Sequence, residues 1–207
     1  MPKKEYDPSV DWRLDKNGEY KHYTKDINYI VTLQDVEVLI SRATNVRDKA
    51  LVAFMYITGA RPYEISKVEH DDIFMEGVNT LIRIPTAKLG SNADRKFTTK
   101  KRTLAFRPDT PFLEYIHMYR HSVKPIAELQ ASQPYIFPIT PDWMKKIIYK
   151  LSNNVLCPYH FRHTRLLKLS REGATADELM AWKGSADIRS VSEYLRDKPI
   201  DREFDIK

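Results

Sequence analysis

The longest apolar run of the chain, residues 51–57, constrains the fold most strongly. It ends at Thr58-Gly59, a pair typical of a helix C-terminus. The run is far too short to cross a bilayer, and the N-terminus is too polar for a signal peptide. Residues 48–57 are therefore predicted to form a largely buried helix, and neither secretion nor membrane insertion is expected.

Most other periodic segments also predict helices. Thr32 and Asp35 form a capping box before apolar residues at helical spacing, and Thr175 and Glu178 form another. Alternating residues at 79–85 and 102–106 instead predict a hairpin, joined by a long basic loop over residues 88–101. Further helices are predicted at residues 33–43, 62–68, 110–122, 142–151, 159–172, 176–183 and 188–195.

These elements predict a mainly α fold with a small antiparallel β-sheet (α+β). Residues 1–28 lack apolar periodicity and are interpreted as a polar N-terminal arm, whereas residues 29–207 form one domain. Hydrophobic residues make up 42% of the 207, which suffices for a core. Lys and Arg number 34 against 28 Asp and Glu, and this net charge of +6 permits a polyanionic partner without proving one.

The sequence offers few residues that could bind a metal ion or form a disulfide. Cys157 is the one cysteine, so neither an internal disulfide nor a Cys-x-x-Cys zinc pair is available, and a reducing compartment is indicated. His117 and His121 stand at i, i+4 spacing, but with no third ligand they fit a solvated helix face better. We predict no metal site and no cofactor.

Three segments place polar groups where the apolar pattern is interrupted. They are Thr58-Gly59-Ala60-Arg61-Pro62-Tyr63-Glu64-Ile65, Pro158-Tyr159-His160-Phe161-Arg162-His163-Thr164, and the surroundings of Tyr194. Arg61 precedes an expected helix start, where it can meet an anion together with free backbone N–H groups. Taken alone, Arg61 also fits a capping ion pair with Glu64, and Tyr194 fits ordinary packing.

Taken together, the segments resemble the catalytic domain of the tyrosine recombinases, the phage-integrase and Xer-like family. The first matches Thr-Gly-x-Arg-x-x-Glu-hydrophobic at every defined position, and Arg162-His163-Thr164 matches the family's Arg-His-Thr box. Residues 184–194 follow the third box without a gap, down to Tyr194. The resemblance covers roughly residues 29–196, and the order and spacing of the boxes make coincidence an unsatisfactory explanation.

The resemblance implies roles for these residues. Tyr194 would attack the scissile phosphate to give a 3′-phosphotyrosyl enzyme, while Arg61 and Arg162 grip the phosphate. A hairpin lysine would protonate the departing 5′ oxygen, and Lys88 is the best match for it. Its competitors are Lys96 and Lys100, and any of these lysines also fits a solvated loop charge.

Two positions depart from the family pattern. Tyr159 stands where the family has a histidine, with His160 shifted by one, and Ser185 stands where it has His or Trp. Both side chains can donate a hydrogen bond to a phosphate oxygen, but neither titrates near neutral pH as imidazole does. We keep Tyr159 and Ser185 as candidate site residues, with the Trp182 indole as an alternative donor.

The function implied is that of a site-specific DNA recombinase or integrase of a phage, mobile element or prokaryotic host. It would act in the cytoplasm of a prokaryotic cell or virus-infected host. The partners implied are double-stranded DNA and a homotetramer on it, with an accessory DNA-bending protein as a further candidate. Two alternatives stay open: a type IB topoisomerase, and a catalytically weak DNA-binding module favoured by the altered Tyr159 and Ser185 and the short N-terminal segment.

Overall fold

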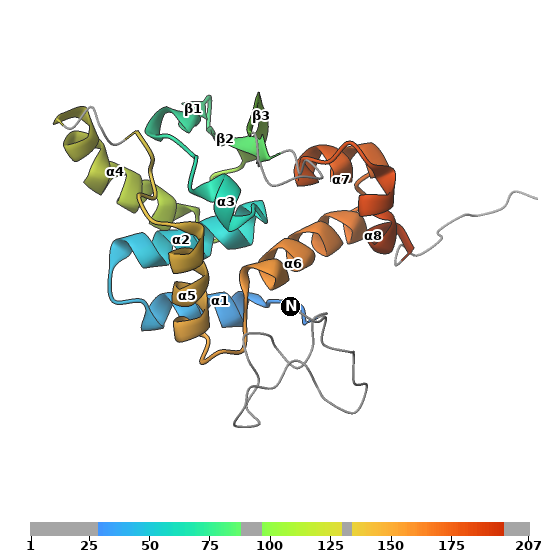
Figure 1. The fold of residues 1–207 in the computed structure, drawn as a ribbon, viewed down its shortest axis with the longest axis horizontal. Coiled ribbons are helices and arrows are strands. Elements are labelled where there is room, and N and C mark those ends of the chain that lie inside the picture. The colour runs from blue at the N-terminus through green and yellow to red at the C-terminus, as the bar shows by residue number, and fades with distance from the viewer. Residues whose placement is uncertain (1–28, 88–96, 130–133, 197–207) are drawn as a thin grey trace, which may run out of the picture.

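The computed structural model describes residues 29–87, 97–129 and 134–196, and the expected arm at 1–28 lies outside them. Within these ranges the protein is mostly helical with a small sheet, as the sequence predicts (Figure 1). The strands are β1 (Ile73–Glu76), β2 (Asn79–Ala87) and β3 (Phe97–Phe106). The helices are α1 (Leu33–Arg42), α2 (Val46–Thr58), α3 (Pro62–Ile65), η1 (His70–Asp72), α4 (Leu113–Leu129), α5 (Pro141–Leu151), α6 (Pro158–Arg171), α7 (Ala176–Lys183), η2 (Ile188–Ser190) and α8 (Ser192–Arg196).

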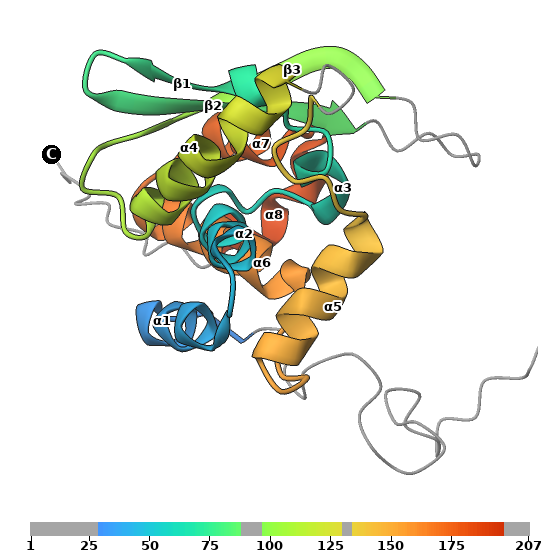
Figure 2. The same cartoon turned by 90° about the vertical axis from the view of Figure 1, so that its left-hand side faces the viewer.

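Helix α2 forms the centre of the main core, as its apolar run predicts. It contacts α1, α4, α5 and α6, and Figure 2 shows it nearly end-on among its neighbours. Leu51, Phe54 and Met55 are fully buried. Among the described residues, no helix is long and apolar enough to span a membrane.

The sheet is antiparallel in the order β1-β2-β3. Ile82 of β2 pairs with Ile73 on one side and with Leu104 on the other. All three side chains are buried against the helices, whereas Arg83 between two inward residues is exposed. This alternation is the pattern from which the strands were predicted.

The structure corrects several predicted bounds. Strand β1 was not predicted, and β3 begins at Phe97, so the predicted long loop is shorter than expected. Helix α3 ends at Ile65 and not at Val68, because a turn at residues 66–67 leads into a stretch that pairs with residues 134–136: the Val68 carbonyl accepts the N–H of Ile136 at 2.9 Å. The last predicted helix is instead two short elements, the 3-10 turn η2 and the helix α8, with Val191 between them.

A second, smaller core lies where α6, α7 and α8 meet. Its buried residues are Leu166, Leu167, Leu179, Val191 and Tyr194. The capping box of Thr175 and Glu178 opens α7, as predicted. Trp182, near the end of α7, packs against both cores and so ties this C-terminal unit to the rest of the domain.

Candidate active site

The turn after α2 brings the first motif against α6. Gly59 has a φ of 61°, and a Cβ there would lie 3.1 Å from the Cβ of Arg165 and 3.4 Å from the Cα of Arg162. Glycine fits this position for two reasons: it tolerates the left-handed backbone, and it has no Cβ to collide with α6. Arg61 follows as the N-cap residue of α3, with Pro62 at the first helical position.

The carboxylate of Glu64 gathers arginines from three parts of the chain. This fully buried group accepts hydrogen bonds from the backbone N–H of Arg61 at 2.9 Å and from its Nη1 at 3.1 Å. Arg102 of β3 donates from Nη1 at 3.3 Å and from Nη2 at 2.9 Å, and Nη1 of Arg162 lies 3.8 Å away. Burial raises the pKa of Glu64, but the arginines outweigh it, so the pKa lies below its usual 4.5.

Two main-chain carbonyls fix Arg162. Its Nη1 donates to the carbonyl of Gly59 at 2.9 Å, and its Nη2 donates to the carbonyl of Lys183 at 2.6 Å. Burial lowers the pKa of this guanidinium, and the charge of Arg61 lowers it further. A buried cation held in this way can offer its remaining N–H donors to an anion without reorganising.

Tyr194 of α8 is buried in the smaller core. Its carbonyl accepts a hydrogen bond from the Ser170 hydroxyl at 2.6 Å, and the Lys183 ammonium lies 5.3 Å from its ring centroid. Burial raises the pKa of the Tyr194 hydroxyl well above its usual value, and a hydrogen bond with the Glu193 carboxylate raises it further. At neutral pH the hydroxyl is therefore protonated.

Tyr159 lies beside Tyr194 with its side chain partly in solvent. It is 43% exposed, and its ring stacks on that of His163 with centroids 6.0 Å apart. The His163 ring in turn lies 5.5 Å from that of Tyr194. Burial raises the pKa of the Tyr159 hydroxyl, and a hydrogen bond joins its side chain to Tyr194.

These side chains meet in one cavity of about 530 Å³. It brings together Arg61, Tyr159, Arg162 and Tyr194, which the sequence places in three separate segments. Its lining is formed by Ala60, Arg61, Pro62, Tyr63, Pro141, Lys145, Tyr149, Cys157, Pro158, Tyr159, Arg162, Lys183, Glu193 and Tyr194. Because its walls combine two guanidinium groups with four phenols, the cavity suits a phosphate ester better than a cation.

Other predicted site residues lie elsewhere. Ser185 does not line the cavity: its hydroxyl accepts hydrogen bonds from the Ser190 hydroxyl at 3.0 Å and from the N–H of Asp187 at 3.3 Å. Lys88 and Lys96 fall outside the described residues, and Lys100 is exposed on β3. Sequence reasoning missed Lys183 and Glu193, although each directly precedes a motif residue, and that adjacency was the available signal.

Trp182, the alternative donor, and His160, the shifted imidazole, both have hydrogen-bond partners within the protein. The indole N–H of Trp182 donates to the carbonyl of Thr58 at 2.8 Å, so this donor already has a partner within the protein. His160 is buried, and its Nδ1 accepts the N–H of Cys157 at 3.0 Å at the start of α6. Both side chains therefore bind main-chain atoms of Thr58 and Cys157, and neither lines the cavity.

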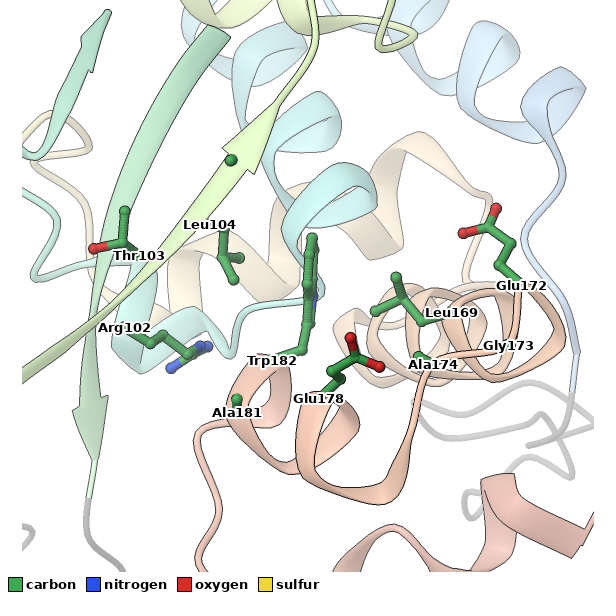
Figure 3. Close-up of a pocket in the computed structure, with 11 residues that line it drawn as sticks. Arg102, Thr103, Leu104, Leu169, Glu172, Gly173, Ala174, Glu178, Ala181 and Trp182 are labelled. Atoms are coloured by element: carbon green, nitrogen blue, oxygen red, sulfur yellow. The ribbon is translucent and has the colours of Figure 1, made fainter. Parts of the chain in front are cut away.

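A larger cavity of about 730 Å³ lies between β3 and the helices α6 and α7. Figure 3 shows Trp182 standing between the strand and α6 at this place. The cavity contains none of the predicted catalytic residues, and its lining includes the carboxylates of Glu172 and Glu178, which repel a phosphate. We therefore place the candidate site in the smaller cavity, because its lining residues suit a phosphate and those of the larger cavity do not.

The histidine pair on α4 is not a simple solvated face. His117 is partly buried, and its Nε2 lies 3.0 Å from the hydroxyl of Thr80 on β2. Burial lowers the pKa of His117, and the charge of Arg120 adds to this. Within the described ranges, no three His, Cys, Asp or Glu side chains are grouped to hold a metal ion.

The chain belongs to the phage integrase family, whose model matches residues 29–199. Its fold is that of tyrosine recombinase catalytic domains, a class of enzymes that cleave and rejoin DNA. Comparison with curated proteins gives no match.

Solved structures show the same fold. XerA recombinase is 16% identical, with a TM-score of 0.59 over 81% of this chain and 58% of that one. XerH site-specific recombinase bound to its difH substrate before cleavage is 14% identical, with a TM-score of 0.60 over 87% of this chain and 55% of that one. The post-cleavage complex of XerH with a palindromic difH substrate is also 14% identical, with a TM-score of 0.61 over 88% of this chain and 57% of that one. This chain thus spans little more than half the length of these recombinases.

Replacing Glu64 by alanine should destabilise the domain strongly. The substitution leaves the guanidinium of Arg102, only 8% exposed, without its carboxylate, and breaking such a buried pair costs about 3–5 kcal/mol. The free energy of unfolding, measured with urea, checks this. Asp109→Ala is the control, because Asp109 and Arg107 form an exposed pair whose loss costs less than about 1 kcal/mol. Equal small losses in both variants would contradict the role given to Glu64.

The stabilising effect of Glu64 should depend on pH in a defined direction. Because its pKa in the folded protein lies below the usual 4.5, ionised Glu64 contributes stability that is present above about pH 4.5 and is lost as the pH falls through the folded-state pKa. The difference in unfolding free energy between the natural protein and Glu64→Gln should therefore be largest near neutral pH and shrink in acid. A difference that is constant with pH would refute this linkage.

Proposed function

We propose that this protein is a site-specific DNA recombinase or integrase that cleaves and rejoins strands through a 3′-phosphotyrosyl intermediate, without a metal ion. The observation that carries the proposal is that Arg61, Arg162 and Tyr194 line one cavity. Membership of the phage integrase family supports it, as does the shared fold of XerH, which was solved bound to difH DNA.

The reaction begins with attack by Tyr194 on phosphorus. A bond forms between the Tyr194 oxygen and phosphorus while the bond from phosphorus to the 5′ oxygen breaks. The proton of the hydroxyl passes to the Glu193 carboxylate, with which it is hydrogen-bonded. Arg61 and Arg162 stabilise the charge that develops on the non-bridging oxygens, and removing one such contact typically costs about 3 kcal/mol of barrier.

The departing 5′ oxygen needs a proton, and we assign the donor as Lys88 of the segment between β2 and β3. We propose that the Tyr159 hydroxyl donates a hydrogen bond to the bound phosphate, and its place in the lining of the same cavity supports this. The assignment of Ser185 stays a prediction. Attack of a 5′ hydroxyl on the phosphotyrosine then reverses the chemistry and rejoins a strand, with no nucleotide cofactor.

The partner we propose is double-stranded DNA, with four protomers acting on two duplexes and an accessory DNA-bending protein as a further component. The test of the proposed recombinase uses a pool of nicked DNA duplexes whose core sequences are randomised. Cleavage of such a duplex traps the protein on the DNA as a covalent adduct that resists denaturant. Strand exchange between recovered duplexes would establish a recombinase. Relaxation of supercoils without exchange would indicate a type IB topoisomerase, and binding without adduct a DNA-binding module.

Tyr194→Phe should abolish the covalent adduct but keep DNA binding. The variant removes only the attacking oxygen, and the ring still fills the smaller core. Gel electrophoresis after denaturation measures the adduct, and a mobility shift measures binding. Tyr159→Phe and Tyr63→Phe are matched controls from the same cavity and should still form the adduct. An undiminished adduct with Tyr194→Phe would move the nucleophile to one of these two tyrosines.

Lys88→Ala should slow cleavage of ordinary DNA by about 100-fold or more, as is typical for loss of a general acid. A substrate with sulfur at the 5′ bridging position has a leaving group that needs no proton, so the variant should cleave it nearly as fast as the natural protein. Arg162→Ala should not be rescued by sulfur, because its charge acts on the non-bridging oxygens. A Lys88→Ala variant that stays defective on the sulfur substrate would transfer the acid role to Lys96 or Lys100.

A further inference from the structure

Lys183, the last residue of α7, contacts both Arg162 and Tyr194. Its carbonyl accepts a hydrogen bond from Nη2 of Arg162 at 2.6 Å. Its ammonium lies over the ring of Tyr194 and donates a hydrogen bond to the carbonyl of Ser190. The side chain thereby lines the same cavity as Arg61 and Arg162.

A lysine in the last turn of a helix often serves only to complement the helix dipole or to cap carbonyls. Lys183 differs from this case because it is partly buried and lines the same cavity as Arg61 and Arg162. Burial lowers the pKa of Lys183, the charge of Arg162 lowers it further, and Glu193 acts in the opposite direction. Capping could be done from solvent, without placing a third cation in the lining of this cavity.

The charges of the cavity are unbalanced. Among its lining residues, the cations are Arg61, Lys145, Arg162 and Lys183, whereas the one carboxylate is Glu193. Lys145 has its own partner outside the lining, Asp142, at 2.9 Å. Behind the lining, the Glu64 carboxylate lies 3.1 Å from Arg61 and 3.8 Å from Arg162 and offsets part of their charge. With Glu193 also counted, Arg61, Arg162 and Lys183 still leave a net positive charge, which favours an anion in the cavity.

A phosphodiester carries one negative charge, but the five-coordinate state formed by an attacking tyrosine oxygen carries about two. A third cation is therefore of most use in the transition state, where the additional charge develops on the non-bridging oxygens. An ammonium also has three N–H donors, and Lys183 uses one of them on the carbonyl of Ser190. The other donors are available to the phosphate.

We propose that Lys183 is a catalytic residue whose ammonium contacts a non-bridging oxygen of the scissile phosphate as Tyr194 attacks. This inference rests on the proposed function, since it concerns the same cavity and the same reaction. It adds a cation that the motif pattern did not single out, and it assigns that cation to charge stabilisation rather than to protonation of the leaving group.

The test compares Lys183→Met and Lys183→Arg with the natural protein on duplexes recovered by covalent capture. Each duplex is made with either a normal phosphate or a methylphosphonate at the cleaved position, where methyl replaces one charged oxygen. On normal phosphate, Lys183→Met should form adduct about 100-fold more slowly or worse, and Lys183→Arg should keep most of the rate. On the methylphosphonate, the deficit of Lys183→Met should largely disappear, because less charge develops there.

Lys168→Met is the matched control. Lys168 lies on α6, outside the cavity, and pairs only loosely with Glu172 at 3.9 Å, so its loss should leave both rates unchanged. Each variant is compared with itself on two substrates, so a reduced folded fraction cancels from the ratio. A thermal melt and Lys183→Gln serve as the check if Lys183→Met does not fold.

The outcomes separate the two proposals. A Lys183→Met rate equal to that of the natural protein, or an equal deficit on phosphate and methylphosphonate, overturns the role of Lys183 and leaves the recombinase proposal standing. Rescue by a bridging sulfur instead of methylphosphonate would make Lys183 the acid, and it too overturns the role proposed. Failure of the natural protein to form any Tyr194 adduct overturns the proposed function itself.

Discussion

The arrangement of the candidate site depends on one buried carboxylate. Glu64 draws Arg61, Arg102 and Arg162 toward one point from a turn, a strand and a helix that are far apart in the sequence. Without that negative charge the guanidinium groups would repel one another in a region of low dielectric. The carboxylate neutralises part of their charge and leaves N–H donors of Arg61 and Arg162 directed at the cavity.

The position of Tyr194 follows from how the smaller core is attached to the larger one. Trp182 packs on both cores, and its indole donates to the carbonyl of Thr58 at the end of α2. Arg162 bridges the same two units by binding the carbonyls of Gly59 and Lys183. These contacts with main-chain atoms hold Tyr194 near the arginines. Because Arg162 binds the carbonyl of Lys183, that contact does not depend on the Lys183 side chain.

The site pairs a protonated phenol with an excess of positive charge. Burial keeps the pKa of Tyr194 high in the DNA-free protein, so it is a poor nucleophile until a phosphate and its neighbours are in place. Tyr159, which stands where the resemblance leads one to expect an imidazole, contributes a hydroxyl that hydrogen-bonds to Tyr194. Its ring stacking on His163 fixes its orientation beside the nucleophile.

The sequence by itself determined most helices and two of the three strands, because periodicity and caps are local signals. That Arg61, Arg162 and Tyr194 share one site was implied by the resemblance to the tyrosine recombinases and not by any local pattern. Strand β1 escaped prediction, since its four residues, Ile73–Glu76, become a strand only by pairing with β2. Tertiary structure alone decided that Trp182 turns to Thr58, that Ser185 stays out of the cavity, and that Lys183 enters it. The physical reason is that a side chain's partner depends on which distant backbone atoms packing brings within hydrogen-bond reach, and no local pattern encodes that distance.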